Sequence, residues 1–287
     1  MRPNTIKTRI FLDGSDSGET HQIIRDLGFL DGQTTNPTLF SKNPRVKEML
    51  AYQNSFSKEN IYTIYKEEVE KISAKIPEGS VSIEVYADKS TTAGEMMNMA
   101  RAMFSWVPNA HIKFPTTREG LIAAEQAVHE GMRVNLTLCF SQEQAAAVYA
   151  ATRGAKKGQV YVSPFVGRLD DRGENGMELI SNILRMYAQG DGHVEVLSAS
   201  IRKLDQLLYA LKLGSDIATT PFIVLKEWAN KGTPVPDKSF VYETKDLKPI
   251  PYKEISLNNN WKEYDIAHDL TAKGIEKFSA DWNSLIR

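Results

Sequence analysis

The sequence predicts an α/β fold and, within that class, a single-domain (β/α)8 TIM barrel. Short apolar runs alternate with helical patterns along most of the chain, and eight such runs occur within 287 residues. This alternation implies parallel strands joined by right-handed crossovers, and one barrel domain commonly has this length. A doubly wound open sheet would give the same alternation, so the number of runs is what favours the barrel.

The recurring unit is a short strand-like run, a polar turn and then a helical pattern. The runs are, in order, RIFLDGSD (9–16), DGQTTNPTLF (31–40), VSIEVYAD (81–88), AHIKFP (110–115), RVNLTLCF (133–140), QVYVSPFVG (159–167), HVEVLSAS (193–200) and SDIATTP (215–221). Ile23, Ile24 and Leu27 mark a helix face after the first run, and Gly28 is a typical helix end. The apolar spacing after the second run predicts one long helix over about 44–76.

Two tetrads with capping-box spacing predict further helix starts. Residues 116–119 predict a helix over about 117–130, and residues 141–144 predict an alanine-rich helix after them. Segment 233–264 interrupts the alternation with prolines and aromatics, and we expect an ordered excursion there. Residues 269–286 predict a C-terminal helix. The sequence leaves open whether the excursion covers the barrel mouth or reshapes a subunit interface.

The composition narrows the classes of partner and cofactor. A net charge of -1 predicts no binding to nucleic acid or to an anionic membrane, and no run approaches the ~18 apolar residues of a membrane span. Cys139 is the only cysteine, which predicts a small buried hydrophobe in a reducing compartment. The start of the sequence lacks a signal-peptide pattern, so we expect a cytoplasmic protein. Unpaired histidine spacing and the lack of glycine-rich phosphate motifs predict no metal and no cofactor.

Polar side chains recur on one face of successive predicted strands. In a barrel, one strand face meets the helices and the other lines the interior. The polar interior positions are predicted to be Asp13, Asn36, Glu84, Lys113, Asn135, Thr137 and Ser163, followed by Ser198, Ser200 and Arg202 on the seventh strand. Any one of them has a structural explanation, such as an ion pair for Glu84 or a turn for Asn36. Because burying unpaired charges costs several kcal/mol, the whole set predicts a site at the C-terminal strand ends.

These motifs resemble those of the transaldolases, in the same order along the chain. They are FLD with Asp13, TTNPTLF with Asn36, VSIEVYAD with Glu84, IKFPTTREG with Lys113, VNLTLCFS with Asn135 and Thr137, SPFVGRLDD with Ser163 and Arg168, and SASIR with Ser200 and Arg202. The resemblance spans about 9–232 and resumes near the C-terminus. It implies a barrel of the class I aldolase type that uses no metal and no cofactor.

The resemblance also implies a reaction and a role for each residue. A dihydroxyacetone unit would pass from sedoheptulose 7-phosphate or fructose 6-phosphate to glyceraldehyde 3-phosphate or erythrose 4-phosphate, a reaction of the pentose phosphate pathway. Lys113 would form a Schiff base, Asp13 would exchange a proton with the departing and arriving aldehydes, and Glu84 with Thr137 would hold a water. The implied substrate-binding residues are Asn36, Asn135, Ser163 and Phe165 around the dihydroxyacetone unit, and Arg168, Ser200 and Arg202 at the phosphate.

Two other functions remain open at this point. A fructose 6-phosphate aldolase would share the lysine and release free dihydroxyacetone, but that subgroup typically has glutamine and tyrosine where this chain has Glu84 and Phe165. A sugar-phosphate binder without catalysis would not need Asp13, Glu84 and Lys113 together. The expected partners are therefore small sugar phosphates. We also expect a homo-oligomer, because the C-terminal helix often packs on a neighbouring subunit in this family.

Overall fold

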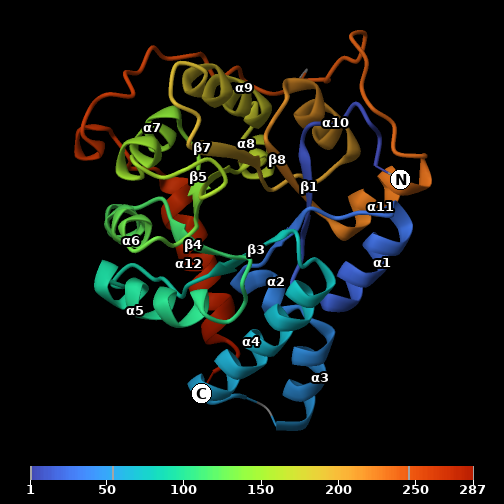
Figure 1. Cartoon of the computed structure of the whole chain (residues 1–287), viewed down its shortest axis with the longest axis vertical. Coiled ribbons are helices and arrows are strands. Elements are labelled where there is room, and N and C mark those ends of the chain that lie inside the picture. The colour runs from blue at the N-terminus through green and yellow to red at the C-terminus, as the bar shows by residue number, and fades with distance from the viewer. Residues whose placement is uncertain (1, 54, 245, 287) are drawn as a thin grey trace.

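Eight parallel strands close into a barrel in sequence order in the computed structural model, which describes residues 2–53, 55–244 and 246–286 (Figure 1). The strands are β1 (Arg9–Asp13), β2 (Gly32–Thr34), β3 (Ser80–Glu84), β4 (Ala110–Pro115), β5 (Val134–Cys139), β6 (Val160–Pro164), β7 (Val194–Ser198) and β8 (Ile217–Pro221). Strand β8 pairs with β1 and completes the ring. The single-domain (β/α)8 barrel predicted from the sequence is confirmed.

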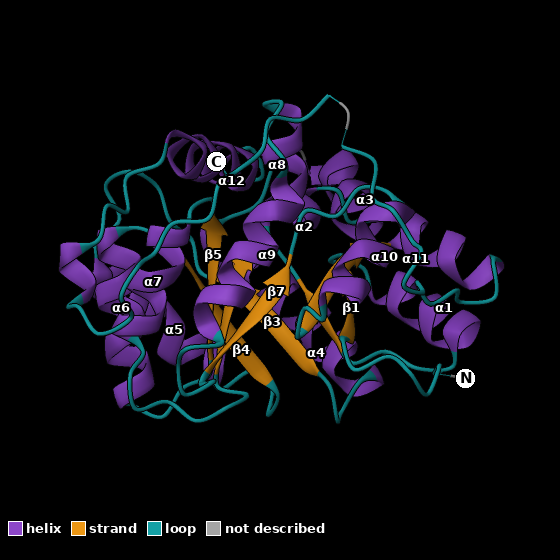
Figure 2. Cartoon of the chain, turned by 90° about the horizontal axis from the view of Figure 1, so that it is seen from above, coloured by secondary structure: helices purple, strands orange, loops and turns teal. Residues whose placement is uncertain are grey.

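Most of the helices surround the barrel on its outer side, and the C-terminal helix lies over one end of it, as Figure 2 shows in purple around the orange strands. The helices are α1 (Ser17–Leu27), α2 (Pro37–Ser41), α3 (Pro44–Gln53), α4 (Lys58–Lys75), α5 (Ala93–Phe104), α6 (Arg118–His129), α7 (Gln142–Ala151), α8 (Val166–Asp171), α9 (Gly176–Tyr187), α10 (Leu204–Leu213), α11 (Phe222–Asn230) and α12 (Asp269–Asn283), with a short 3-10 turn at Trp261–Glu263. None of the described helices is long and apolar enough to cross a membrane.

The apolar alternation of the strands builds the core between strands and helices. Ile10, Leu12, Val81 and Ile83 are fully buried, as expected for strand positions that face the helix layer. The interior side of the same strands is different, because polar groups occupy much of it. This division places the chemistry inside the barrel and the main apolar core outside it.

The predicted helix over 44–76 is wrong in one respect, because it is two helices. Ser57 caps α4 by accepting a hydrogen bond from the Asn60 amide at 3.2 Å. Just before it, the Phe56 amide donates to the Leu285 carbonyl at 2.9 Å. The chain therefore leaves the helical path to pair with the C-terminal segment, and such a long-range contact has no local signal in the sequence.

The predicted helix starts near 117 and 142 are confirmed to within a residue. Thr117 caps α6, with its hydroxyl accepting from the Gly120 amide at 3.1 Å, and Ser141 caps α7 in the same way. Glu119 does not complete a capping box, because the cap is Thr117 and not Thr116, and the Glu119 carboxylate instead accepts a hydrogen bond from the Ala93 amide of α5. The acidic residue thereby joins two neighbouring helices of the outer layer.

Segment 233–264 is an ordered strap around the outside of the barrel. Lys248 pairs with the loop before α9, the Asn182 amide of α9 donates to the Ile250 carbonyl at 2.8 Å, and the Gln142 side chain of α7 bonds the Lys253 backbone in both directions. Trp261 then reaches Glu125 of α6. Figure 1 shows this orange-to-red path over α9 and α7 before α12 begins. The strap runs over the outside of the helix layer, and α12 follows it at the C-terminal ends of the strands, the mouth of the barrel.

Candidate active site

A buried ion pair lies near the C-terminal ends of two adjacent strands. Glu84 of β3 and Lys113 of β4 are register partners, and Lys113 Nζ lies 2.7 Å from Glu84 Oε2. Both side chains are about 5% exposed or less. Lys113 Nζ also donates to the Thr35 carbonyl at 2.9 Å. The amine is therefore fixed on two sides inside the barrel.

Burial and the lysine act in opposite directions on Glu84. Burial raises the pKa of this carboxyl, whereas the positive charge of Lys113 and its hydrogen bond to Glu84 lower that pKa. The Glu84 amide donates to the Tyr65 hydroxyl at 3.2 Å, and Tyr65 also bonds Thr35 at 2.5 Å. Tyr65 of α4 thus ties together the two residues that hold Lys113.

Asp13 occupies the end of β1 on the same cavity. Its carboxylate accepts a hydrogen bond from Thr34 at 2.8 Å, and Thr34 in turn bonds Thr219 of β8 at 2.6 Å. Burial raises the pKa of Asp13, whereas Lys113 and the Thr34 hydrogen bond lower it. A carboxyl with a raised pKa is suited to accept and return a proton during a reaction near neutral pH.

The interior amide and hydroxyl groups fall into two sets. The Ser163 hydroxyl donates to Asn135 Oδ1 at 2.6 Å, and Asn135 Nδ2 donates to the Ser82 hydroxyl at 3.1 Å, so these side chains position one another. The buried Thr137 hydroxyl has no hydrogen-bond partner among the described residues. Because buried hydroxyls are normally paired, Thr137 has hydrogen-bonding capacity for a ligand.

Asn36 combines a structural role with a place in the cavity wall. Its Oδ1 accepts from the Leu39 amide at 2.9 Å and caps α2, in agreement with the turn role considered from the sequence. Its side-chain amide nitrogen makes no hydrogen bond to the described part of the chain, and the residue lines the cavity. Asn36 can therefore donate to a bound molecule while it caps the helix.

Two arginines lie at the far side of the cavity. Arg168 of α8 packs between two aromatic rings, 5.4 Å from the Phe165 ring and 5.2 Å from the Phe278 ring. Arg202 forms an ion pair with Asp171 and is about half exposed. Burial lowers the pKa of Arg168, Glu84 opposes that shift, and Arg202 adds to it. The pair of guanidinium groups makes this end of the cavity suited to an anion.

A glycine permits the close approach of these arginines. A side chain on Gly167 would lie 2.5 Å from both Arg202 Nε and the Ser200 carbonyl oxygen. The Gly167 amide donates to that carbonyl at 3.0 Å. The short helix α8 therefore sits directly on the loop after β7, which brings Arg168 and Arg202 to one place.

The structure corrects the predicted face of Ser198. Phe11 and Tyr161 meet across the barrel interior with ring centroids 6.1 Å apart, whereas Ser198 is in register with Ala218 on the helix-facing side and bonds Ser215 at 2.9 Å. Strand β7 ends at Ser198, and Ser200 has a left-handed φ of 57°. This turn breaks the alternation, so Ser200 and Arg202 reach the cavity from a loop and not from a strand face.

One cavity of about 310 Å³ brings most of the predicted residues together. Its lining includes Asp13, Asn36, Lys113, Thr137, Ser163, Phe165, Arg168, Ser200 and Arg202. Glu84 and Asn135 lie behind this lining, where they hold Lys113 and Ser163. Among the described residues, no group of three or more His, Cys, Asp and Glu side chains is placed to hold a metal ion.

Several residues of the site were not predicted from the sequence. Thr35 and Tyr65 hold the lysine, Thr34 and Thr219 support Asp13, and Lys277 and Phe278 line the cavity from α12. Thr34 and Thr219 follow the strand alternation and could have been found by the same count. Lys277 and Phe278 lie on a distant helix, where strand alternation gives no signal.

Comparison with known proteins shows the family of the chain. Residues 10–287 match the family model described as transaldolase/fructose-6-phosphate aldolase. The chain is 35% identical to a probable transaldolase of Dehalococcoides mccartyi over 277 residues, covering 96% of this chain and 99% of that protein. It is 34% identical to a probable transaldolase of Paracoccus denitrificans over 274 residues, covering 96% of each. The protein described here belongs to the transaldolase/fructose-6-phosphate aldolase family.

Proposed function

We propose that this protein is a transaldolase that moves a dihydroxyacetone unit between sugar phosphates through a Schiff base on Lys113. The observation that supports this most directly is the buried Lys113–Glu84 pair at 2.7 Å, beside a hydroxyl of Thr137 with no partner among the described residues. A buried amine with an adjacent carboxylate can lose a proton, attack a ketone and expel water. The proposed donors are sedoheptulose 7-phosphate and fructose 6-phosphate.

The proposed first half-reaction forms the imine and breaks a carbon–carbon bond. Lys113 Nζ adds to the ketone carbon, the carbonyl oxygen leaves as water, and Glu84 and Thr137 move the protons of this exchange. Asp13 then takes the proton from the hydroxyl on the carbon that becomes the departing aldehyde. The electron pair of that bond passes into the iminium, which leaves an aldehyde and an enamine on Lys113.

The proposed second half-reaction runs the same steps backwards with a new aldehyde. The enamine adds to glyceraldehyde 3-phosphate or erythrose 4-phosphate, Asp13 returns its proton to the new hydroxyl, and water hydrolyses the imine. Asn36, Ser163 and the Asn135 that holds Ser163 would keep the enamine in place between the two halves. Arg168, Ser200 and Arg202, which line the same cavity as Lys113, would bind the phosphate of either sugar.

The same family contains fructose 6-phosphate aldolases, which differ in the fate of the enamine. Release of free dihydroxyacetone requires protonation of the enamine carbon. Here Phe165 presents a ring that contacts Phe140 and Arg168 and offers no hydroxyl to place a proton donor. Transfer to an aldehyde is therefore favoured over release.

Borohydride trapping tests the Schiff base. Fructose 6-phosphate with sodium borohydride should add the mass of a reduced dihydroxyacetone unit to Lys113, and Lys113→Ala should abolish the adduct. An adduct that persists in Lys113→Ala would overturn the assignment. The reaction class is tested by turnover of fructose 6-phosphate with and without erythrose 4-phosphate, since comparable turnover without an acceptor would identify an aldolase.

The proposed setting is the pentose phosphate pathway in the cytoplasm, with sugar phosphates as the partners and the chain assembled as a homo-oligomer. The donor and acceptor classes above support the pathway. Size-exclusion chromatography with light scattering would test the assembly, and a mass equal to one chain would refute it.

A further inference from the structure

We propose that Lys277 of α12 is a further phosphate-binding residue of this cavity, acting with Arg168 and Arg202. This proposal rests on the proposed function, because it takes the anion to be the phosphate of a sugar phosphate. Lys277 and its neighbour Phe278 line the same cavity as Lys113, Ser200 and the two arginines. Helix α12 is therefore part of the substrate site.

Close packing fixes α12 over the end of β5, beyond whose arrowhead it lies in Figure 2. A side chain on Gly274 would lie 2.6 Å from Leu138 Cδ2 and 2.7 Å from Arg168 Nη1, so only glycine lets the helix come this near. One turn earlier, the Thr271 hydroxyl donates to the Leu138 carbonyl at 2.9 Å. Lys277 follows one turn after Gly274, on the same side of the cavity as Arg168.

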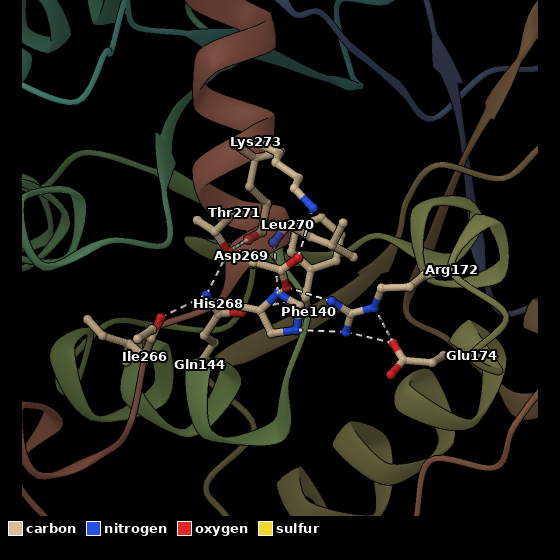
Figure 3. Close-up of polar contacts among 12 residues, drawn as sticks. Phe140, Gln144, Arg172, Glu174, Ile266, His268, Asp269, Leu270, Thr271 and Lys273 are labelled. Atoms are coloured by element: carbon tan, nitrogen blue, oxygen red, sulfur yellow. Dashed lines mark hydrogen bonds and ion pairs between the residues drawn. The ribbon is translucent and has the colours of Figure 1, made fainter.

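The first turn of α12 is anchored by polar contacts that Figure 3 shows with Gln144 of α7, with Arg172 just after α8 and with Ile266 just before α12. The buried Gln144 amide donates to the Ile266 carbonyl at 3.1 Å and to Thr271 at 2.9 Å. Arg172 bridges Asp269 at 2.5 Å and Glu174 at 2.7 Å. Because these contacts come from several elements of the protein, they hold α12 in place without a bound substrate.

The last turns of α12 are anchored by aromatic packing. Trp282 is buried against Phe40, Tyr62 and Tyr65, with ring centroids 5.2 to 5.8 Å apart. Tyr65 is the same residue that supports Thr35 beneath Lys113. Lys277 thus lies between two anchored ends of the helix. The C-terminal end packs on Tyr65, which also supports the residues that hold Lys113.

The cations around this end of the cavity differ in how they are paired. Arg168 makes no hydrogen bond or ion pair with the described residues and is held by Phe165 and Phe278 alone. Lys277 pairs with Asp281 one turn further along α12, and Asp281 also accepts from the Thr38 hydroxyl. Further charge-assisted contacts would strengthen the binding of a phosphate dianion beyond what one guanidinium provides. Lys277 and Arg202 are nearby cations whose own side chains are exposed, by 60% and 47%.

The Lys277–Asp281 pair can be exchanged for a phosphate at low cost. The lysine side chain is 60% exposed and that of Asp281 is 15% exposed, and i,i+4 pairs on helices contribute only about 0.3–0.5 kcal/mol. The Thr38 hydroxyl continues to satisfy Asp281 when Lys277 turns away. A charge-assisted contact to phosphate is stronger than such a surface pair, so the exchange is favourable.

Lys273 provides a matched control on the same helix. It lies one turn before Lys277, pairs with Asp269 at the same i,i+4 spacing at 3.1 Å, and has 69% side-chain exposure. It borders a different cavity, between α12 and the loop at Asp88–Ser90, and not the one that holds Lys113. Lys277→Met and Lys273→Met each remove one i,i+4 pair of an exposed lysine from the helix, with Asp281 at 15% exposure and Asp269 at 52%, and only the first removes a charge from the proposed site.

The experiment measures binding of inorganic phosphate by calorimetry and KM for erythrose 4-phosphate against unphosphorylated glyceraldehyde. Lys277→Met should raise the phosphate Kd and the KM for erythrose 4-phosphate about three- to tenfold, as expected for one partly exposed charge-assisted contact. The KM for glyceraldehyde should not change, Lys277→Arg should restore the phosphate Kd, and Lys273→Met should match the wild type.

The outcomes separate this proposal from the proposed function. Equal phosphate binding in Lys277→Met and the wild type, or equal losses with both aldehydes, would overturn the role of Lys277 and leave the Schiff base intact. If Lys277→Met loses phosphate binding and the wild type gives no borohydride adduct, the anion site would be supported and the transaldolase reaction would be refuted.

Discussion

Lys113 Nζ lies 2.7 Å from Glu84 Oε2, with both side chains buried inside the barrel next to the cavity. A buried pair of opposite charges contributes little net stability, because desolvation offsets most of the attraction. The proposed chemistry explains why this chain has one here: the lysine needs a group that accepts its proton and manages the water of imine formation.

Glu84→Gln should lower kcat for dihydroxyacetone transfer by about 10²- to 10⁴-fold, the usual contribution of a positioned acid or base. The amide keeps the shape of the carboxylate but cannot take the proton from Lys113. Steady-state kinetics with fructose 6-phosphate and erythrose 4-phosphate would measure the loss. A kcat within a factor of about three of the wild type would exclude Glu84 from proton transfer.

Glu195→Gln is the matched control for that variant. Glu195 is also a buried barrel acid paired with a cation, Arg9, at 2.9 Å, but neither residue lines the cavity with Lys113. We expect the control to lose thermal stability while the folded enzyme keeps its kcat. Circular dichroism melts of both variants would separate a catalytic loss from a folding loss.

Arg202→Ala should raise KM for phosphorylated aldehydes by about 10- to 100-fold, because a charge-assisted bond to phosphate contributes about 1.5–3 kcal/mol. Unphosphorylated glyceraldehyde should show little change. Arg185→Ala removes an arginine that pairs with Glu254 on the outer surface, and it should leave both values unaltered. Equal losses with both aldehydes would rule out a phosphate role for Arg202.

Acid should destabilise the fold partly through His111 at the base of the barrel. Its Nε2 bonds the Gly158 carbonyl at 3.0 Å, which requires a proton on Nε2, so Nδ1 accepts from Ser80 at 2.8 Å. Burial lowers the pKa of His111 to about 3, and the usual value in an unfolded chain is about 6.5. The unfolded state therefore binds a proton that the folded state does not, and this contribution to stability is lost progressively as pH falls from about 6.5 towards 3.

His111→Gln should reduce this acid dependence by up to about 1.4 kcal/mol per pH unit below pH 6.5. Burial raises the pKa of Asp13 and Glu84, which acts in the opposite direction as their carboxyls protonate, so the slopes of variants must be compared with one another. His129→Gln, at an exposed position of α6, is the control and should keep the wild-type slope. Urea unfolding between pH 7.5 and 5 would measure how the free energy of unfolding changes with pH. Identical slopes in the wild type and both variants would contradict the role of His111.

Gly120→Ala should destabilise the protein by about 3 kcal/mol or more, because the new methyl group would overlap the Pro115 carbonyl oxygen at the end of β4. Gly94→Ala is the control in the first turn of α5, where a methyl group would meet nothing within 4 Å. Alanine there should raise stability by up to about 1 kcal/mol. Thermal melts of both variants would test the pair, and a similar Tm for both would show that the strand end can move.

Much of the site could be predicted from the sequence because strand alternation is a local property. Glu84, Lys113, Asn135 and Thr137 follow it, and the structure places all four inside the barrel. Ser198 was assigned to the wrong face because the alternation stops at the left-handed turn of Ser200. The backbone at such a turn depends on the contacts of Gly167 with the Ser200 carbonyl, which join two separate strand ends.

The sequence by itself determined the alternation of strands and helices and the polar face of the strands, because each depends on periodicity within a few residues, and the number of strand runs favoured the barrel over an open sheet. Only the tertiary structure decided that the strap runs outside the helix layer, that α12 covers the mouth, and that Lys277 and Phe278 join Arg168 at the cavity. These relationships come from packing between elements far apart in the chain. Gly274 against Leu138 and Trp282 against Tyr65 have no local pattern from which they could be inferred.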